Sequence, residues 1–374
     1  MGTPYGVEGL WNCALAIGGQ EYPATTTNIV ELLWFESVHQ SLPSLNLTIK
    51  DWDESFAKIA SVGDGVKIDI TLGDGKGGET SATFNIQGPP QITPGNGYNT
   101  VKMNAVLDAI EYNRKIPQGL YEGTSNDAIS KLAGEAGLTP VTPTSTNDSQ
   151  VWLPNNNSIV NFVKSIAQHA YAGDSSAMTV GVTDQRQLIF GDANDLINQS
   201  TGVTLGYDES QGHIIIQDWN GTSSGMVANN FKSYGATTAF WTPEGILSEL
   251  NKVTATLFGT NLFSFSSQNS DRIGDMGTRV DMQPRPAGNT HDKYNEAAHI
   301  NTRTRSMWNV DFNCTTYQYT GIQLLSGVDV APYRYGLPGQ SEIFTGRMLL
   351  TAKTKALFNS KYVERLTLTT NGGA

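Results

Sequence analysis

The stretch Trp308–Thr315 alternates large apolar residues at even positions with polar residues at odd positions. Only an extended strand with one buried face and one solvated face has this period of two. Two further strand-like segments follow at 344–358 and 362–369. About the last sixty residues are therefore expected to form an antiparallel sheet or barrel. They contain no cluster of acids, bases or nucleophiles, which favours a structural or interaction protein over an enzyme.

Length and composition predict a folded, loop-rich protein of several domains. The chain has 374 residues, and at about 150 residues per domain two or three domains are expected. Charged residues are only 16%, while Gly, Asn, Thr and Ser are abundant, which is typical of turn-rich β structure. The formal net charge of −11 argues against a general nucleic-acid binder, because such proteins need an excess of Lys and Arg.

Two cysteines and the start of the sequence indicate the compartment. Cys13 and Cys314 are far apart in sequence, and Cys314 lies in the apolar phase of its strand, so two free thiols are expected rather than a disulfide. The first residues lack a basic segment followed by an apolar run, and no window is apolar over the length of a bilayer-spanning helix. We expect a protein kept soluble in the cytoplasm.

The first part of the chain predicts a β module. Strands are expected at 29–36, 45–49, 66–72 and 101–107, with a short helix at 51–60 between the second and third. The glycine-rich segment Gly73–Gly78 follows the third strand. A β turn is expected there rather than a phosphate-binding loop, because the Gly-Lys-Ser/Thr ending is missing.

The middle of the chain predicts a small α+β domain. One helix is expected after Thr124, with an apolar stripe that ends at Gly137, and a second over 159–170. A hairpin of 178–182 and 188–190 follows. Strands are expected again at 203–207 and 213–216, a helix starting at Thr242–Glu244, a polar loop over 264–290 and a helix near 292–303.

Candidate chemical sites all have a structural explanation. The five histidines do not have the spacing of metal ligands; they are His39, His169, His213, His291 and His299. The acidic run Asp51–Glu54 stands at a predicted helix start, where carboxylates complement the helix dipole. Trp34 and Trp308 fall inside predicted strands, which favours core or interface packing over a glycan groove. We predict no catalytic, cofactor-binding or metal-binding residues.

Three parts of the chain carry a resemblance to one known family. The middle domain contributes 126–138, 157–163 and the hairpin end 188–192. The last part contributes 326–330, 344–351 and 362–368, and the segment Ser61–Ile68 of the first part repeats a fragment of that last pattern. Taken together, these segments resemble the phage tail hub proteins, the family that includes late control protein D and the hub of contractile-tail baseplates. Residues 264–290 and 2–20 have no counterpart in that family.

The resemblance implies a β-rich α+β, multidomain fold with two related tube-protein-like β-barrels and a small α+β domain between them. The domains would be 1–115, 116–202 and 203–374, the last with a helical and loop insertion at about 240–305. It implies a homotrimer whose six similar barrels join a six-fold tail tube, or a distal tube protein, to a three-fold central spike.

The hub resemblance also implies further partners and a location. Neighbouring baseplate proteins would surround the ring, and phage DNA would pass through a neutral or negative channel without specific binding. The protein would have no membrane anchor and would be part of the virion tail, assembled in the host bacterial cytoplasm. Two alternatives stay open: a hub or spike base of a type VI secretion system or tailocin, and a glycan-binding or cell-wall-degrading tail protein.

Overall fold

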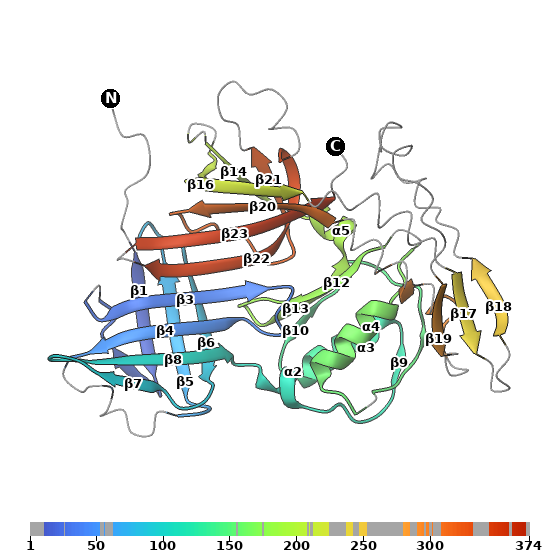
Figure 1. Ribbon diagram of the computed structural model, residues 1–374, viewed down its shortest axis with the longest axis horizontal. Coiled ribbons are helices and arrows are strands. Elements are labelled where there is room, and N and C mark those ends of the chain that lie inside the picture. The colour runs from blue at the N-terminus through green and yellow to red at the C-terminus, as the bar shows by residue number, and fades with distance from the viewer. Residues whose placement is uncertain are drawn as a thin grey trace.

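The computed structural model describes most of the chain. From residue 11 to residue 223 the structure describes every residue except 26, 53–55, 57–62, 155, 174–175, 208 and 210–211. Beyond residue 223 it describes 237–241, 247–252, 280–284, 290–294, 297–298, 301, 308–331, 344–358 and 361–371. Within these residues one 15-stranded sheet dominates, with a small helical region at one side (Figure 1). The β-rich α+β class predicted from the sequence is confirmed.

Eight strands come from the first part of the chain. They are β1 (Asn12–Ile17), β2 (Gln20–Tyr22), β3 (Ile29–Ser37), β4 (Ser44–Asp51), β5 (Lys67–Gly73), β6 (Glu79–Ile86), β7 (Gln91–Pro94) and β8 (Asn99–Leu107). The predicted strands of this region are therefore present, and Gly73–Gly78 makes the turn between β5 and β6, with Gly73 opposite Glu79. Strands β1 and β2 lie in a segment for which the sequence made no prediction. Most of the helix expected at 51–60 lies outside the described residues.

The last part of the chain adds seven strands to the same sheet. They are β14 (Ser200–Gly206), β15 (Ile214–Ile215), β16 (Asp218–Ser223), β20 (Trp308–Thr316), β21 (Gly327–Ala331), β22 (Gly346–Phe358) and β23 (Lys361–Asn371). The alternation of apolar and polar residues is confirmed in β20, because Val310, Phe312 and Cys314 are buried while Asp311 and Asn313 between them are partly exposed.

Eight of the strands form one antiparallel series in the order β7-β8-β4-β3-β22-β23-β20-β16. Figure 1 shows them stacked from the lower edge of the sheet to its upper edge. The first four strands of the series and the last four have the same internal order. If the strands of each group are numbered one to four along the chain, they lie in the sheet in the order three, four, two, one. The sheet thus consists of two halves with one connectivity, joined where β3 pairs with β22.

A second layer covers one face of each half. In the first half β1, β5 and β6 are paired side by side, and in the second half β14 and β21 are paired. Apolar side chains fill the space between the layers because they alternate toward it from every strand. Trp34 of β3 meets Phe84 of β6 edge to face, with ring centroids 5.1 Å apart.

The middle region is built on two helices. Its elements are α2 (Ile110–Arg114), β9 (Tyr121–Gly123), α3 (Ser125–Glu135), β10 (Thr139–Val141), β11 (Gln150–Trp152), α4 (Ile159–His169), β12 (Met178–Val182), β13 (Gln187–Asp192) and α5 (Ala193–Asn198). Thr124 and Asp127 form a capping box at the start of α3, as the sequence indicated. Both predicted helices and the β12–β13 hairpin are confirmed.

The secondary structure predicted for the insertion at about 240–305 is wrong in part. Residues Leu247–Lys252, expected in a helix, form strand β18, and Val280–Pro284, expected in a loop, form β19. Both pair with β17 (Thr237–Trp241), a segment of Thr, Phe and Trp that favours strands. Pairing with this neighbour outweighs the local helix preference of a short leucine-containing segment. Residues 242–246, 264–279 and 285–289 lie outside the described part.

Candidate functional site

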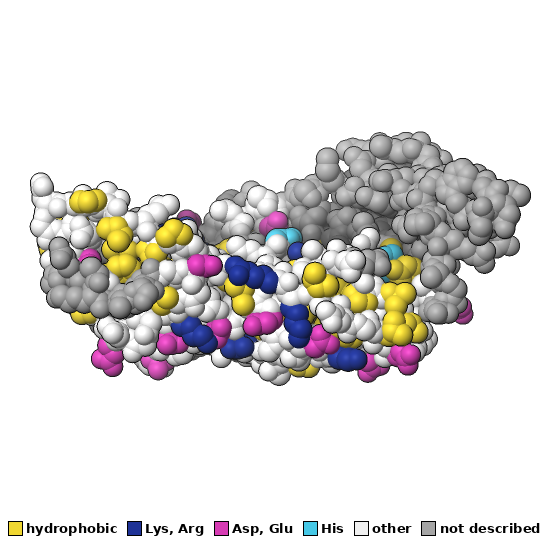
Figure 2. Space-filling model, turned by 90° about the horizontal axis from the view of Figure 1, so that it is seen from below, with side chains coloured by type: hydrophobic (Ala, Val, Ile, Leu, Met, Phe, Trp, Pro, Cys, Tyr) yellow, Lys and Arg dark blue, Asp and Glu magenta, His cyan; other side chains and the backbone are white. Residues whose placement is uncertain are grey.

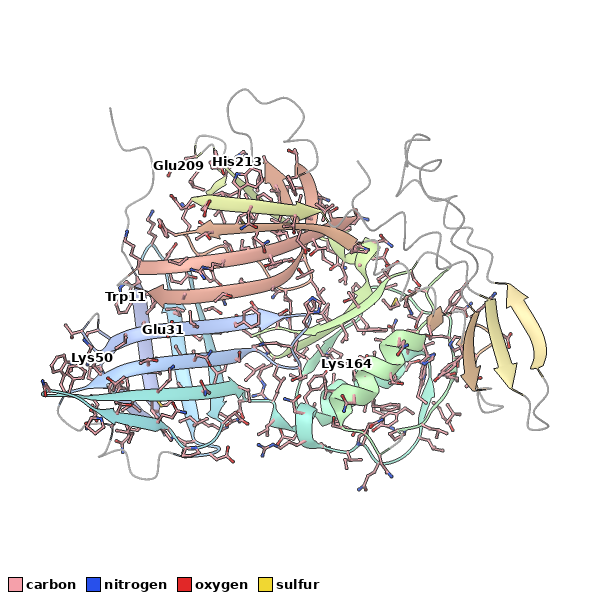
Figure 3. All side chains as sticks on the ribbon, viewed as in Figure 1. Trp11, Glu31, Lys50, Lys164, Glu209 and His213 are labelled. Carbon is pink, nitrogen blue, oxygen red and sulfur yellow. The ribbon has the colours of Figure 1, made fainter. Side chains whose placement is uncertain are left out.

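The charged side chains on the open face of the eight-stranded series are almost balanced. The charged side chains that β3, β4, β8, β16, β20 and β23 direct away from the core are Glu31, Asp218, Asp311, Lys50, Lys102, Lys361 and Arg365. Figure 3 shows Glu31 and Lys50 toward the same end of neighbouring strands β3 and β4. Three acids against four bases leave no field that would hold a polyanion.

Hydroxyl and amide groups tie neighbouring strands together across this face. The Asn313 side-chain amide donates to Asn220 Oδ1 at 3.1 Å, and the Thr367 hydroxyl donates to Asn313 Oδ1 at 2.8 Å. The Thr369 hydroxyl donates to Asp311 Oδ1 at 2.8 Å. Cross-strand pairs of this kind fix register without apolar packing. Polar side chains therefore hold β16, β20 and β23 in register on this face.

Strand β22 joins the two halves of the sheet. Its first residues pair with β21, from Gly346 opposite Val330 to Leu349 opposite Gly327. Its later residues pair with β3, from Ala352 opposite Ser37 to Phe358 opposite Glu31. A register shift between Leu350 and Ala352 separates the two stretches. This bulge places Lys353 and Lys355, rather than their neighbours, on the buried face.

A buried ionic cluster lies on the inner side of this junction. Lys353 Nζ is 2.9 Å from Glu36 Oε1 on β3, and Lys355 pairs with Asp184 in the turn between β12 and β13. Glu364 on β23 accepts from the Tyr362 hydroxyl and, at 2.6 Å, from the Thr320 hydroxyl. The cluster thus connects the first half, the second half and the middle region.

Neighbouring charges favour the charged forms of Lys353 and Asp184, whereas burial and the Lys353 ammonium lower the pKa of Lys355. Burial alone would lower the pKa of Lys353, but the carboxylates of Glu36, Glu364 and Asp184 raise it above its ordinary value. Burial alone would raise the pKa of Asp184, but the ammonium groups of Lys355 and Lys353 hold it below its ordinary value. Removal of either partner would leave an uncompensated buried charge.

A cavity of about 350 Å³ borders this cluster, lined by Glu79, Thr80, Asp184, Gln185, Tyr319, Lys353 and Lys355 among others. Both lysines are engaged, because Lys353 also donates to the Ile322 carbonyl and Lys355 lies 4.5 Å from the centre of the Trp34 ring. A group acting as base or nucleophile needs to be released from such partners. The arrangement therefore suits a structural tie rather than a catalytic centre.

The free edges of the series are β7 and β16. All four residues of β7 are exposed, Ile92 by 55%, and Pro94 closes the strand. On β16 Asp218 and Asn220 are exposed, and among the described strands β20 is its one partner. Edge strands offer unpaired backbone groups to a further strand. Figure 2 shows the side of the molecule next to β7 and β8, where acidic and basic side chains are interspersed.

Of the candidate histidines named from the sequence, the structure brings His169 and His291 together, with His291 Nε2 3.0 Å from the His169 carbonyl. The candidate acids Asp51 and Asp74 have local structural roles. Asp51 is buried and accepts from the Phe56 amide at 3.1 Å. Asp74 of the glycine-rich turn accepts from the Lys76 and Tyr319 amides at 2.8 and 3.0 Å. His39 is exposed after β3, and His299 lies outside the described residues. Over the described ranges, no three His, Cys, Asp or Glu side chains are grouped to hold a metal ion.

The ionic cluster was not predicted from the sequence. A signal exists: Glu36 follows Leu32 and Trp34 in the buried phase of β3, and Glu364 stands between Tyr362 and Leu366 in the buried phase of β23. A charged residue in the apolar phase of an alternating strand needs a buried partner. Lys353 and Lys355 could not be found in this way, because the bulge in β22 changes the phase.

Cys13 and Cys314 are both free thiols, as predicted. Burial raises the pKa of each to about 12, so both are poor nucleophiles at neutral pH. None of the helices in the described part of the chain is long and apolar enough to cross a bilayer.

Comparisons with known proteins place the fold. No family model and no curated protein matches the sequence. Among solved structures, the chain is similar to a tail protein from Neisseria meningitidis, with a TM-score of 0.61, 12% identity and 97% of each chain covered.

Two further structures extend this likeness. A 43 kDa tail protein of a Mu-like prophage of Shewanella oneidensis has a TM-score of 0.63 and 12% identity, over 97% of this chain and 99% of that one. A type VI secretion component of Escherichia coli, described as similar to bacteriophage T4 tail proteins, has a TM-score of 0.53 and 10% identity over 95% and 76%. The structural neighbours are thus phage tail and secretion proteins, which confirms the resemblance inferred from the sequence at the level of the fold.

Proposed function

We propose that this chain is a structural, non-enzymatic hub protein of a phage tail. It forms a trimeric ring that joins the six-fold tail tube to the three-fold central spike. The observation that carries the proposal is the repeated connectivity of the main sheet, β7-β8-β4-β3 followed by β22-β23-β20-β16. Three copies of a chain with two such halves present six similar units around one axis, so a three-fold object matches a six-fold one.

The junction inside the chain supplies the pattern for closing the ring. Within one copy, the first strand of one half (β3) pairs with the third strand of the other (β22). The same rule applied between copies brings β16 of one copy beside β7 of the next. Twenty-four strands at about 4.8 Å spacing give a circumference of roughly 115 Å and a diameter of at least about 37 Å. Such a ring encloses a channel for DNA.

Each half together with its covering layer would be a tube-like barrel, with the barrel modules at 1–115 and 203–374 and the α+β domain at 116–202 between them. The covering strands β1, β5 and β6 in one half and β14 and β21 in the other support this assignment.

The open face of the sheet would line the channel. Its near balance of charge supports passage of DNA without binding, because ion pairs with phosphate would slow sliding. Reversing Asp218 and Asp311 to Lys should slow DNA ejection from the virions that assemble. Unchanged ejection rates in virions carrying both substitutions would count against a channel-lining face.

The partners follow from the two ends of such a ring. A tail tube or distal tube protein would dock on one side, the central spike on the other, and neighbouring baseplate proteins around it. The protein would be assembled in the host cytoplasm and remain in the virion tail. The similarity to two tail proteins over nearly their full lengths supports this location.

The mass of the protein in solution is the primary test. Light scattering on the purified chain should give three times the chain mass of 40.4 kDa, and negative-stain images should show a ring with a central hole. A monomer at all concentrations, also when mixed with its tube protein, would overturn the proposal.

The second candidate is a hub or spike base in a type VI secretion system or tailocin. The likeness to the Escherichia coli secretion component favours it. Genes for capsid and terminase beside this gene would support the phage, and their absence beside genes for a contractile apparatus would support the secretion or killing device.

A further inference from the structure

The segment from residue 290 to 301 lies against the middle region. His291 and Tyr294 contact α4 and β11, and the described residues Ala297, Ala298 and Asn301 further along are buried. This segment is the return path from the inserted strands β17–β19 to β20 in the main sheet. Its attachment therefore fixes where the insertion rejoins the body of the protein.

Four contacts hold the histidine end of the segment. The rings of Tyr294 and His169 stack with centroids 3.9 Å apart and an angle of 6°. His169 Nδ1 lies 3.1 Å from the Tyr294 carbonyl, and His291 Nε2 lies 3.0 Å from the His169 carbonyl. The His291 amide donates to Gln150 Oε1 at 3.0 Å.

These contacts determine which nitrogen of His291 carries the proton. A carbonyl oxygen only accepts, so Nε2 is the N–H that donates to His169. The second nitrogen, Nδ1, is buried and has no hydrogen-bond partner. A proton added there would create a buried N–H without an acceptor, which is unfavourable. The docked arrangement thus requires neutral His291.

The surroundings of His291 have opposing effects on its pKa. Burial lowers its pKa, and the His169 carbonyl and the carboxylates of Asp148 and Asp292 partly offset this effect. Asp148 is itself occupied, because it accepts from the Ser125 and Tyr171 amides at 2.9 Å each. The aromatic rings of Trp152 and Tyr294 flank the imidazole on its other sides.

The far end of the segment is held by a group that does not titrate. Asn301 Oδ1 accepts from the Met178 amide at 3.0 Å, and its Nδ2 donates to the carbonyls of Ala170 and Gln168 at 2.8 and 3.0 Å. Asn301 therefore links the end of α4 to β12 at any pH.

We propose that His291 is an acid-sensitive clasp: below neutral pH, residues 290–294 detach from α4 and β11, while Asn301 keeps the other end of the segment in place. The sign follows from proton linkage. A histidine that is harder to protonate when docked binds more protons when released, so docking weakens as the pH falls below the range of a free histidine. The clasp is closed at neutral pH and opens in acid.

Hydrogen exchange on the full chain tests this at about pH 7.5 and about pH 5.5, with intrinsic exchange rates corrected for pH. Protection of amides in 290–294 should fall by up to roughly tenfold per pH unit, the limit for one coupled proton. Protection in 297–301 should change little. Equal protection at both pH values in 290–294 would overturn the proposal.

Two variants make the result specific. His291→Phe keeps an aromatic ring beside Trp152 and Tyr294 but cannot titrate. In this variant the protection of the 290–294 amides from hydrogen exchange should be the same at both pH values, whether it is high or low. His39→Asn removes an exposed histidine that follows β3 and should behave like the unchanged chain. A pH dependence that persists in His291→Phe would assign the effect to another group and refute the clasp.

Discussion

The two halves of the main sheet share a strand order but differ in how their outer strands are built. In the second half β22 runs over Gly346–Phe358 and pairs on both sides, whereas its counterpart in the first half, β7, has only the residues Gln91–Pro94. The long strand carries a buried ionic cluster where it pairs with β3, and the short strand ends at a proline. The same connectivity can therefore carry a permanent junction in one place and an open edge in another.

The interiors of the halves differ as well. The first half shares one continuous apolar cluster with the middle region, which includes Trp34, Phe84 and Phe190. The second half has its own smaller cluster around Phe312, Leu350 and Leu368. Equal connectivity thus does not require equal packing. Leu357 of β22 and Tyr362 of β23 belong to the first cluster, so apolar contacts as well as the ionic cluster connect the two halves.

Breaking the junction should have the largest effect. Asp184→Asn leaves the Lys355 ammonium buried without its carboxylate, and the free energy of unfolding should fall by about 3–5 kcal/mol. Denaturant unfolding followed by circular dichroism measures this. The pKa of Asp184 is lower in the folded protein than in the unfolded chain. The ionised carboxylate therefore stabilises the fold above pH ~4, and this stabilisation is lost as the pH falls through the pKa of the folded state.

The matched control for that substitution is Arg347→Ala, which removes an exposed pair with Asp329 whose atoms are 3.0 Å apart. This substitution should lower the free energy of unfolding by only about 0–1 kcal/mol. If both substitutions lower the free energy of unfolding equally, the buried pair contributes no more to stability than the exposed one.

Core truncation compares the two interiors directly. Leu47→Ala in the first half and Leu368→Ala in the second each remove a fully buried side chain and should cost about 2–5 kcal/mol. Calorimetry should show whether both halves melt together. Because the junction couples them, either variant should lower a single transition; a second transition that moves in only one variant would show that the halves unfold independently.

The open edge should respond more weakly. Ile92→Lys places a charge on an exposed strand, so the chain should stay folded. The proposed trimer should then dissociate at concentrations roughly tenfold to a hundredfold higher than before, because about 1–3 kcal/mol of binding free energy is lost per contact. Sedimentation over a dilution series measures this. Val30→Lys, at another exposed apolar residue, is the control and should leave the trimer unchanged.

The smallest effects should appear in thiol labelling, where each half carries one cysteine. Cys13 is partly exposed in β1 and Cys314 is buried in β20, and burial raises the pKa of both to about 12. A disulfide reagent at neutral pH should therefore label Cys13 slowly and Cys314 only when the second half opens. Rapid labelling of Cys314 in the folded protein would show that β20 is not a protected strand.

Much of this fold could be predicted from the sequence because its strands alternate clearly. The phase of β20 was readable from Val310 and Phe312 alone, and the start of α3 from Thr124 and Asp127. Those signals are local, since they depend on period and on caps that lie within a few residues. The predicted free thiols follow from the same phase.

The parts that could not be predicted depend on distant contacts. Leu247–Lys252 is a strand because β17 lies beside it, and nothing in the segment itself indicates that partner. Lys353 is buried because a bulge shifts β22 by one position and because Glu36 comes from the other end of the chain. Pairings across three hundred residues leave no trace in a single sequence, so the ionic cluster had no local signal on β22.

The pairing of β3 with β22 also determines how the protein resists a mechanical force. From Ala352 opposite Ser37 to Phe358 opposite Glu31, the two strands run antiparallel in register, and ladder hydrogen bonds lie across the strand direction. A pull along the strands stretches all of these bonds together, whereas a pull across them opens one after another. The chain is therefore stiff against shear between its halves and comparatively easy to peel from one end.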